Sequence, residues 1–311
     1  MDLSLAIRRA GAADRSTRPF RDHFRLPAGQ VAAFGTIDSG YPAGALALTP
    51  PPPVLFVRGS GPLPPRSECL AIIGARRCTP EGRVIARQMA VAAARAGLVV
   101  VSGLALGIDG AAHEGAVDAA GRSLAVLASA VDDPTPRAHA GLAGEILEGG
   151  GWLLSERPPG ASVEGWSFPW RNRIVAAVSG AVLVIEAGLR SGTLSTVRHA
   201  LQVGTRVGVV PGSVLSPASA GANALIREGA VPVTCPDDAV GLLRLRTSAP
   251  RAPLRDEEEA LLRGIPGAGA PADQWIARSG LPEVQARACL LALIARGELL
   301  RRGGRVIRSA W

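Results

Sequence analysis

The sequence predicts an α/β fold, an extended Rossmann-like parallel sheet with a small C-terminal winged-helix domain. Two observations lead to this prediction. From about residue 69 onward, short β-branched runs alternate with alanine-rich stretches of helical length, and strands buried on both faces of a parallel sheet have this composition. After a proline-containing linker, three helical patterns precede a hairpin pattern, which is the order of elements in a winged helix.

Apolar runs define the predicted strands of the main sheet. They are Leu70–Ile73, Leu98–Val101, Leu124–Leu127, Trp152–Leu154, Val182–Ile185 and Val207–Val210, with a short strand Val54–Val57 before them. Helical stretches such as Val84–Ala96 and Ala138–Leu147 separate these runs. Alternation of this kind requires right-handed crossovers between parallel strands.

The chain is expected to divide into four segments. Residues 1–53 form an N-terminal arm or a degenerate N-terminal domain, and they end in a proline run. Residues 54–246 form the Rossmann-like domain, and residues 247–255 form a linker. Residues 256–311 form the winged-helix-like domain, whose predicted helices and hairpin strands are Glu257–Leu262, Pro271–Ser279, Pro282–Gly297, Leu299–Arg302 and Arg305–Arg308.

Composition restricts the function classes. The formal net charge is +8, and all 34 basic residues are arginine because the chain contains no lysine. A codon bias explains the replacement of lysine but not the basic surplus, which favours polyanionic partners. Without lysine, a P-loop ATPase and a pyridoxal phosphate enzyme are excluded.

The lack of targeting signals in the sequence favours a cytoplasmic location. The four cysteines form no C-x-x-C pair, so free thiols in a reducing compartment are expected. The N-terminus lacks the apolar core of a signal peptide, and the longest uncharged stretches are broken by Pro, Gly, Ser and Asn, so no transmembrane helix is expected. We therefore expect a cytoplasmic protein that does not associate with membranes.

Glycine-containing turns follow several predicted strands, where doubly wound sheets bind ligands. In the first turn, Gly74 and Arg76 precede a helix that begins after Pro80. The helix N-terminus offers free N–H groups and Arg76 adds a cation, although an ordinary turn with a surface arginine explains the pattern equally. The segment lacks G-x-G-x-x-G, and no acidic residue follows the second strand at the ribose-binding position, so a dinucleotide site is only weakly supported.

A second small-residue loop contains Ser102, Gly103 and Gly107. Its glycines allow the backbone to approach an anion closely. Asp109 is expected to cap the following helix. His113 lies one turn further on, within reach of Asp109, which leaves a metal or acid–base role for the pair as an alternative.

An aromatic and basic segment runs from Trp166 to Arg173, and its Pro169 suits the first turn of a helix. Its candidates for base stacking are Phe168 and Trp170, and its other candidate site residues are Arg171, Asn172 and Arg173. The two arginines point in different directions on a helix, so both cannot face one phosphate. Core packing of the aromatic rings and salt bridges of the arginines remain the alternative.

The turn after the fifth run contains Ser191, Gly192 and Thr193, which open a helix and present N–H and hydroxyl donors to an anion. Because the carboxyl ends of parallel strands share one edge, we expect these loops to converge. Catalytic signatures are missing, since the sequence contains neither G-x-S-x-G nor H-E-x-x-H. Asp109, Glu156 and Glu186 could meet at the strand ends, but no spacing identifies a catalytic pair of acids.

The motifs AIIGARRCTPEG, VVSGLALGIDGAAH, LLSERPPG, FPWRNRIVAAVS, VLVIEAGLRSGTLSTVRHAL, VVPG and SAGANALIREGA occur in this order between Tyr41 and Asp238. Together they resemble the DNA-processing protein A family (DprA/Smf). The resemblance implies a homodimer that binds single-stranded DNA and delivers it to the RecA recombinase in natural transformation. It places a phosphate-pocket arginine at Arg76, the small-residue loop at Ser102, Gly103 and Gly107, and a basic residue at Arg137.

The sequence departs from the family pattern in three places, one of which is Glu81, where the family usually has a tyrosine before Gly82. The Y-P-x-x-N pattern is Thr135-Pro136-Arg137-Ala138-His139 here, without its tyrosine and asparagine. The helix-hairpin-helix domain that is often N-terminal in the family is not apparent in residues 1–40.

The expected function is therefore non-catalytic binding of single-stranded DNA, which protects incoming strands and loads RecA. No enzymatic activity, cofactor or metal is expected. The first alternative is a nucleotide enzyme of the related phosphoribohydrolases, which carry P-G-G-x-G-T-x-x-E; the nearest segment, Arg190–Ser195, lacks the paired glycine and the glutamate. The second is a regulator whose winged helix is the main DNA reader.

Overall fold

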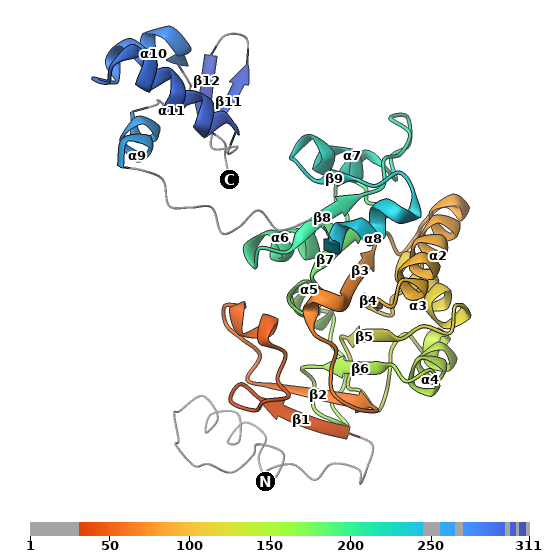
Figure 1. Ribbon diagram of the computed structural model, residues 1–311. Coiled ribbons are helices and arrows are strands. Elements are labelled where there is room, and N and C mark those ends of the chain that lie inside the picture. The colour runs from red at the N-terminus through yellow and green to blue at the C-terminus, as the bar shows by residue number, and fades with distance from the viewer. Residues whose placement is uncertain (1–30, 245–255, 265–269, 296–298, 303–304, 309–311) are drawn as a thin grey trace. The chain divides into compact units, whose positions relative to one another are not determined.

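The computed structural model describes residues 31–244, 256–264, 270–295, 299–302 and 305–308. The chain divides into two compact units between Leu245 and Arg246. The larger unit holds a nine-stranded sheet with the order β1-β2-β6-β5-β4-β3-β7-β8-β9. Helices flank both sides of this sheet (Figure 1), which confirms the Rossmann-like α/β prediction.

Seven strands of the large sheet are parallel. They are β3 Cys69–Ile73, β4 Val99–Ser102, β5 Ser123–Leu127, β6 Trp152–Ser155, β7 Ala181–Val184, β8 Arg206–Val209 and β9 Val231–Pro232. The six predicted strands of this region lie within one or two residues of these bounds. Each of β3 to β7 is buried along its whole length, as their β-branched composition requires.

Two antiparallel strands extend the sheet beyond β6. They are β1 Val31–Gly35 and β2 Val54–Gly59, where β2 pairs with both β1 and β6. Two 3-10 turns, η2 Ala43–Ala47 and η3 Arg66–Glu68, flank β2 along the chain. Residues 31–53, which the sequence assigned to an arm, thus contribute an edge strand and a covering turn to the main unit; residues 1–30 lie outside the described part.

One face of the sheet carries α2 Pro80–Arg95, α3 Ile108–Asp118, α4 Ala140–Glu148 and α8 Pro236–Arg244. The other carries α5 Ser167–Ala177, α6 Thr193–Gln202 and α7 Ala220–Arg227, whose apolar side chains join the same core cluster as η2. A third 3-10 turn, η4 Arg137–His139, leads into α4. No helix among the described residues has both the length and the apolarity needed to cross a lipid bilayer.

Helix α2 begins where its sequence predicts. Thr79 is the N-cap, and its Oγ1 accepts a hydrogen bond of 3.0 Å from the N–H of Gly82. Pro80 occupies the first helical position, where its missing N–H costs nothing. This cap fixes the start of α2 directly behind the loop that carries Arg76.

The smaller unit contains α9 Asp256–Arg263, α10 Ala272–Arg278, α11 Glu283–Ala295 and a three-stranded sheet of β10 Ala270–Pro271, β11 Leu299–Arg302 and β12 Arg305–Arg308. The three helices and the hairpin occur at the predicted positions, and the hairpin bounds match residue for residue. The buried side chains of Trp275, Cys289 and Leu293 belong to its separate core. Its assignment as a winged helix stays a prediction.

Candidate nucleic-acid interface

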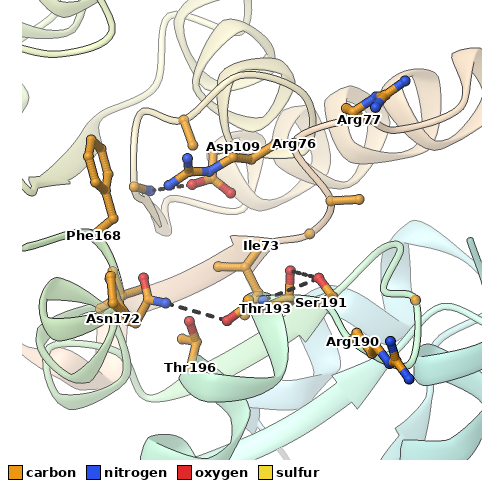
Figure 2. A pocket seen from close by; sticks show the side chains of 18 of the residues that line it. Ile73, Arg76, Arg77, Asp109, Phe168, Asn172, Arg190, Ser191, Thr193 and Thr196 are labelled. Carbon is orange, nitrogen blue, oxygen red and sulfur yellow. Dashed lines mark hydrogen bonds between the residues drawn. The ribbon is translucent and has the colours of Figure 1, made fainter. Parts of the chain in front are cut away.

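A cavity of about 710 Å³ lies at the carboxyl edge of the large sheet. Strand β3 pairs with β4 on one side and with β7 on the other, so the strand order reverses here, and such switch points bind ligands in doubly wound sheets. The loops after β3, β4, β7 and β8 and the first turns of α5 line the cavity (Figure 2). The prediction that these loops converge is correct.

Arginine dominates the charge of the cavity. Its lining holds four arginines, Arg76, Arg77, Arg171 and Arg190, and one carboxylate, Asp109. Arg76, Arg77 and Arg190 are exposed. The guanidinium carbon of Arg76 lies 4.9 Å from the centroid of the Phe168 ring. The cavity therefore presents exposed cations beside the Phe168 ring, as expected of a binder of phosphates and bases.

Arg171 differs from the other three because it is buried, with 6% of its surface exposed. Its Nη1 donates to the carbonyl oxygen of Gly103 at 2.6 Å and also to that of Val126. Burial lowers the pKa of Arg171 to about 10, an effect that Asp109 opposes. The group remains charged at neutral pH, but its donors hold the β4–α3 loop. Arg171 therefore positions this loop, and because it also lines the cavity, its expected contact with phosphate stays a prediction.

Asp109 also has a structural role. Its Oδ2 accepts a hydrogen bond of 3.1 Å from the N–H of Gly103, and burial raises its pKa against the opposing charge of Arg171. The N-cap of α3 is Gly107, without a side-chain bond, so the expected capping by Asp109 is wrong. His113 hydrogen-bonds Ser123 Oγ through Nδ1 at 2.7 Å, and the alternative of an Asp109–His113 pair finds no support.

The small-residue loop acts through close packing. Ser102 donates its hydroxyl to the carbonyl oxygen of Ile72 at 2.7 Å and does not line the cavity. At Gly107 the φ angle is +83°, and a Cβ there would lie 2.4 Å from the carbonyl oxygen of Ala75. The N–H of Gly103 is bound to Asp109, and the predicted phosphate contacts of Ser102, Gly103 and Gly107 stay predictions. Gly74 does line the cavity, and a Cβ there would lie 2.6 Å from Ile108.

The N-terminus of α2 already holds an anion from the protein. Glu186, at the end of β7, accepts from the N–H of Thr79 at 2.9 Å and from the Thr79 hydroxyl. A Cβ at Gly82 would lie 2.4 Å from this carboxyl group. The position where a Rossmann domain binds a dinucleotide phosphate is thus filled by Glu186, in agreement with the missing G-x-G-x-x-G pattern.

The N-terminus of α6 opens into the cavity. Ser191, Gly192 and Thr193 line it as predicted, with Ser191 Oγ accepting from the Thr193 N–H at 3.2 Å. Asn172 on α5 donates to Ser195 Oγ at 3.1 Å and links the two helices. Ser191 and Thr193 lie across the cavity from Phe168 (Figure 2), so a phosphate between them and Phe168 would meet the positive end of the α6 dipole.

Two predicted arginines lie outside the cavity lining. Arg173 is 3% exposed, and its Nη2 binds Glu156 at 2.6 Å, so the expected phosphate contact is corrected to a buried ion pair. Arg137 is exposed in η4, after β5 on the same sheet edge. Sequence reasoning did not select Arg77 and Arg190; a basic residue within a glycine-containing strand–helix turn was the available signal.

The three carboxylates considered as catalytic candidates do not meet. Asp109 binds the backbone of Gly103, Glu156 binds Arg173 and Glu186 binds Thr79. Within the described residues, no group of three or more His, Cys, Asp or Glu side chains is arranged to hold a metal ion.

Comparison with known proteins identifies relatives of this chain. The family model for DNA recombination-mediator protein A matches residues 33–244. The chain is 38% identical to the putative DNA processing protein DprA of Mycobacterium tuberculosis over 317 residues, which covers 98% of this chain and 78% of that protein.

Two solved structures are similar. DNA processing protein A from Streptococcus pneumoniae has a TM-score of 0.63 and 31% identity, covering 76% of this chain and 86% of that one. DNA processing protein A from Helicobacter pylori has a TM-score of 0.60 and 28% identity, covering 72% and 98%. With its sheet order, its cavity and these matches, the chain belongs to the DNA recombination-mediator protein A family.

Proposed function

We propose that this protein binds single-stranded DNA without catalysing a reaction on it, through the cavity at the switch point of the large sheet. The observation that carries the proposal is the set of exposed arginines, Arg76, Arg77 and Arg190, around the open N-terminus of α6. Guanidinium groups and helix N-termini are both suited to phosphodiesters. The description of the Helicobacter pylori relative as binding single-stranded DNA supports the same ligand.

A non-catalytic role is consistent with the hydrogen bonds and ion pairs that the carboxylates near the cavity make within the protein. The carboxylates near the cavity each hold part of the protein, and Glu186 fills the α2 terminus. The alternative of a nucleotide hydrolase is tested by incubating the protein with nucleoside monophosphates. Release of free base at a rate that scales with protein concentration would favour the enzyme and contradict the proposal.

The direct test is the Arg76→Ala substitution in a gel-shift assay with a single-stranded oligonucleotide across a salt series. Loss of one phosphate contact should weaken binding and reduce the slope of log affinity against log salt by roughly 0.7. Arg87→Ala is the control because it removes the same charge from an exposed arginine that pairs with Asp118 on α3. Equal affinities and slopes for both variants and the unmodified protein would refute the assignment of the cavity.

The family resemblance extends the proposal to a homodimer that protects incoming strands in the cytoplasm and delivers them to RecA during transformation. Sedimentation of the full chain tests the dimer. Displacement of a single-strand-binding competitor by RecA, with and without this protein, tests delivery. Deletion of residues 250–311 should leave most single-strand affinity; its complete loss would make the C-terminal unit the main DNA reader.

A further inference from the structure

The cavity at the switch point combines a basic rim with a buried floor. The rim is formed by its exposed lining residues, which include Arg76, Arg77 and Arg190. The floor is formed by the lining side chains that are at least nine-tenths buried, namely Ile73, Asp109, Arg171, Val175, Thr193 and Thr196. The volume of about 710 Å³ lies within the range of roughly 300–1,000 Å³ that encloses a whole small molecule. The cavity therefore has more room than phosphate groups at its rim would occupy.

The hydroxyl of Thr196, on the floor, is available to a ligand. Thr196 is 3% exposed, and its side chain points into the cavity between Asn172 and Thr193 (Figure 2). Its hydroxyl makes no hydrogen bond with any residue that the structure describes, whereas the Thr193 hydroxyl accepts one of 2.9 Å from Ser191 Oγ. Because buried polar groups in proteins are almost always hydrogen-bonded, the Thr196 hydroxyl marks a place for a polar atom of a bound molecule.

The distribution of charge favours phosphate at the rim and an uncharged group on the floor. The floor holds one carboxylate, Asp109, and one guanidinium, Arg171, so it carries no net charge. The net positive charge of the described lining thus comes from the exposed arginines of the rim. Moving a phosphate from water onto the apolar side chains of Ile73 and Val175 would be costly. A group without charge, with apolar faces and a polar edge, suits the floor.

Helix α6 connects the rim with the floor. Exposure falls along it from Gly192, which is exposed, to the buried Thr193 and Thr196. These two threonines are three residues apart, so they lie on one side of the helix and about 4.5 Å apart along its axis. A phosphate at the N-terminus of α6 would therefore have the sugar and base of its own nucleotide about one helical turn deeper, beside Thr196.

We propose that the floor encloses one unstacked base of the strand whose phosphates the rim holds, an inference that rests on the proposed function. A nucleobase is an uncharged ring with two apolar faces, and its sugar joins it to a phosphate. A hydroxyl both donates and accepts hydrogen bonds, so Thr196 can bind the polar edge of any base. A base in a duplex must unpair and unstack before it enters such a pocket, which costs free energy. The floor therefore favours single strands over duplexes.

The test compares three strands of equal length that carry the same phosphates: an oligothymidylate, a fully abasic strand, and an abasic strand with one central thymine. The unmodified protein should bind the fully abasic strand about tenfold more weakly than the oligothymidylate, as for base contacts in other single-strand sites. The single thymine should restore most of this difference, because one base fills the floor. Affinity that rises evenly with the number of bases, without a large step at the first, would overturn the proposal.

Two substitutions of Thr196 test the floor itself. Thr196→Leu fills part of it and should reduce affinity for the oligothymidylate to that for the abasic strand, while affinity for the abasic strand stays unchanged. Thr196→Val removes only the hydroxyl and should weaken binding of the oligothymidylate by about fivefold, as expected for one hydrogen bond. Leu201→Thr is the matched control and should behave like the unmodified protein, because Leu201 lies on the same helix, is exposed and is outside the cavity lining.

Circular dichroism shows whether Thr196→Leu is folded, and Thr196→Val decides if it is not. Full retention of the preference for thymine by Thr196→Val would overturn the enclosed base. Equal weakening toward the oligothymidylate and the abasic strand would also overturn it, because the floor would then hold phosphate or sugar. Equal binding of all three strands by the unmodified protein would refute the enclosed base alone, whereas failure to bind any strand would refute the proposed function itself.

Discussion

Replacing Arg171 should damage stability, whereas replacing Arg76 should damage DNA binding. In the Arg171→Met variant, the carbonyl oxygens of Gly103 and Val126 lose their donor, and the buried Asp109 loses its neighbouring cation. Removing one of two buried charges that interact costs up to about 3–5 kcal/mol. Since the cavity admits water to the Gly103 side, the lower end, about 3 kcal/mol, is expected.

Urea unfolding at neutral pH measures this loss for Arg171→Met, Asp109→Asn and the double variant. The double variant should lose about 1–2 kcal/mol less than the sum of the single losses, because the two groups interact. Arg76→Ala should unfold within about 0.5 kcal/mol of the unmodified protein because Arg76 is exposed. A loss below about 1 kcal/mol for Arg171→Met would refute its structural role.

Three further predictions follow from buried contacts. Burial lowers the pKa of His113 to about 3 from 6.5, so below pH 6.5 the unfolded chain binds a proton that the folded chain does not. The free energy of unfolding of the unmodified protein, relative to that of His113→Asn, should thus fall by about 1.4 kcal/mol per pH unit toward pH 3. Urea unfolding at several pH values measures this difference. A difference that does not change with pH would contradict the prediction. Thr79→Ala removes the α2 cap and a donor to Glu186 and should cost about 2 kcal/mol in thermal unfolding, whereas Thr79→Ser should cost much less. Gly107→Ala puts a Cβ at positive φ against the backbone of Ala75. It should lower the free energy of unfolding by more than about 1 kcal/mol and weaken DNA binding, because the loop carrying Arg76 must move. Unchanged affinity for DNA would show that this packing is unimportant for binding.

The sequence by itself determined the architecture of the sheet and the place of its site. Runs such as Leu70–Ile73 and Val182–Ile185 are apolar at every position, and only a strand buried on both faces accepts that pattern. The glycine-containing turns after them then had to share one edge, where Gly74, Arg76 and Ser191 indeed lie. The pairing of β11 with β12 was equally local, because two short runs separated by Gly-Gly in the sequence predict their own register.

Only the tertiary structure decided which arginines are available to a ligand. Arg171 and Arg173 are two residues apart on α5 and chemically identical, yet one holds the Gly103 loop and the other pairs with Glu156, while Arg76 stays exposed. Their partners lie far away in the sequence. A guanidinium carries the same charge in every context, and its role depends on whether the folded chain places an acceptor within reach or leaves it in water.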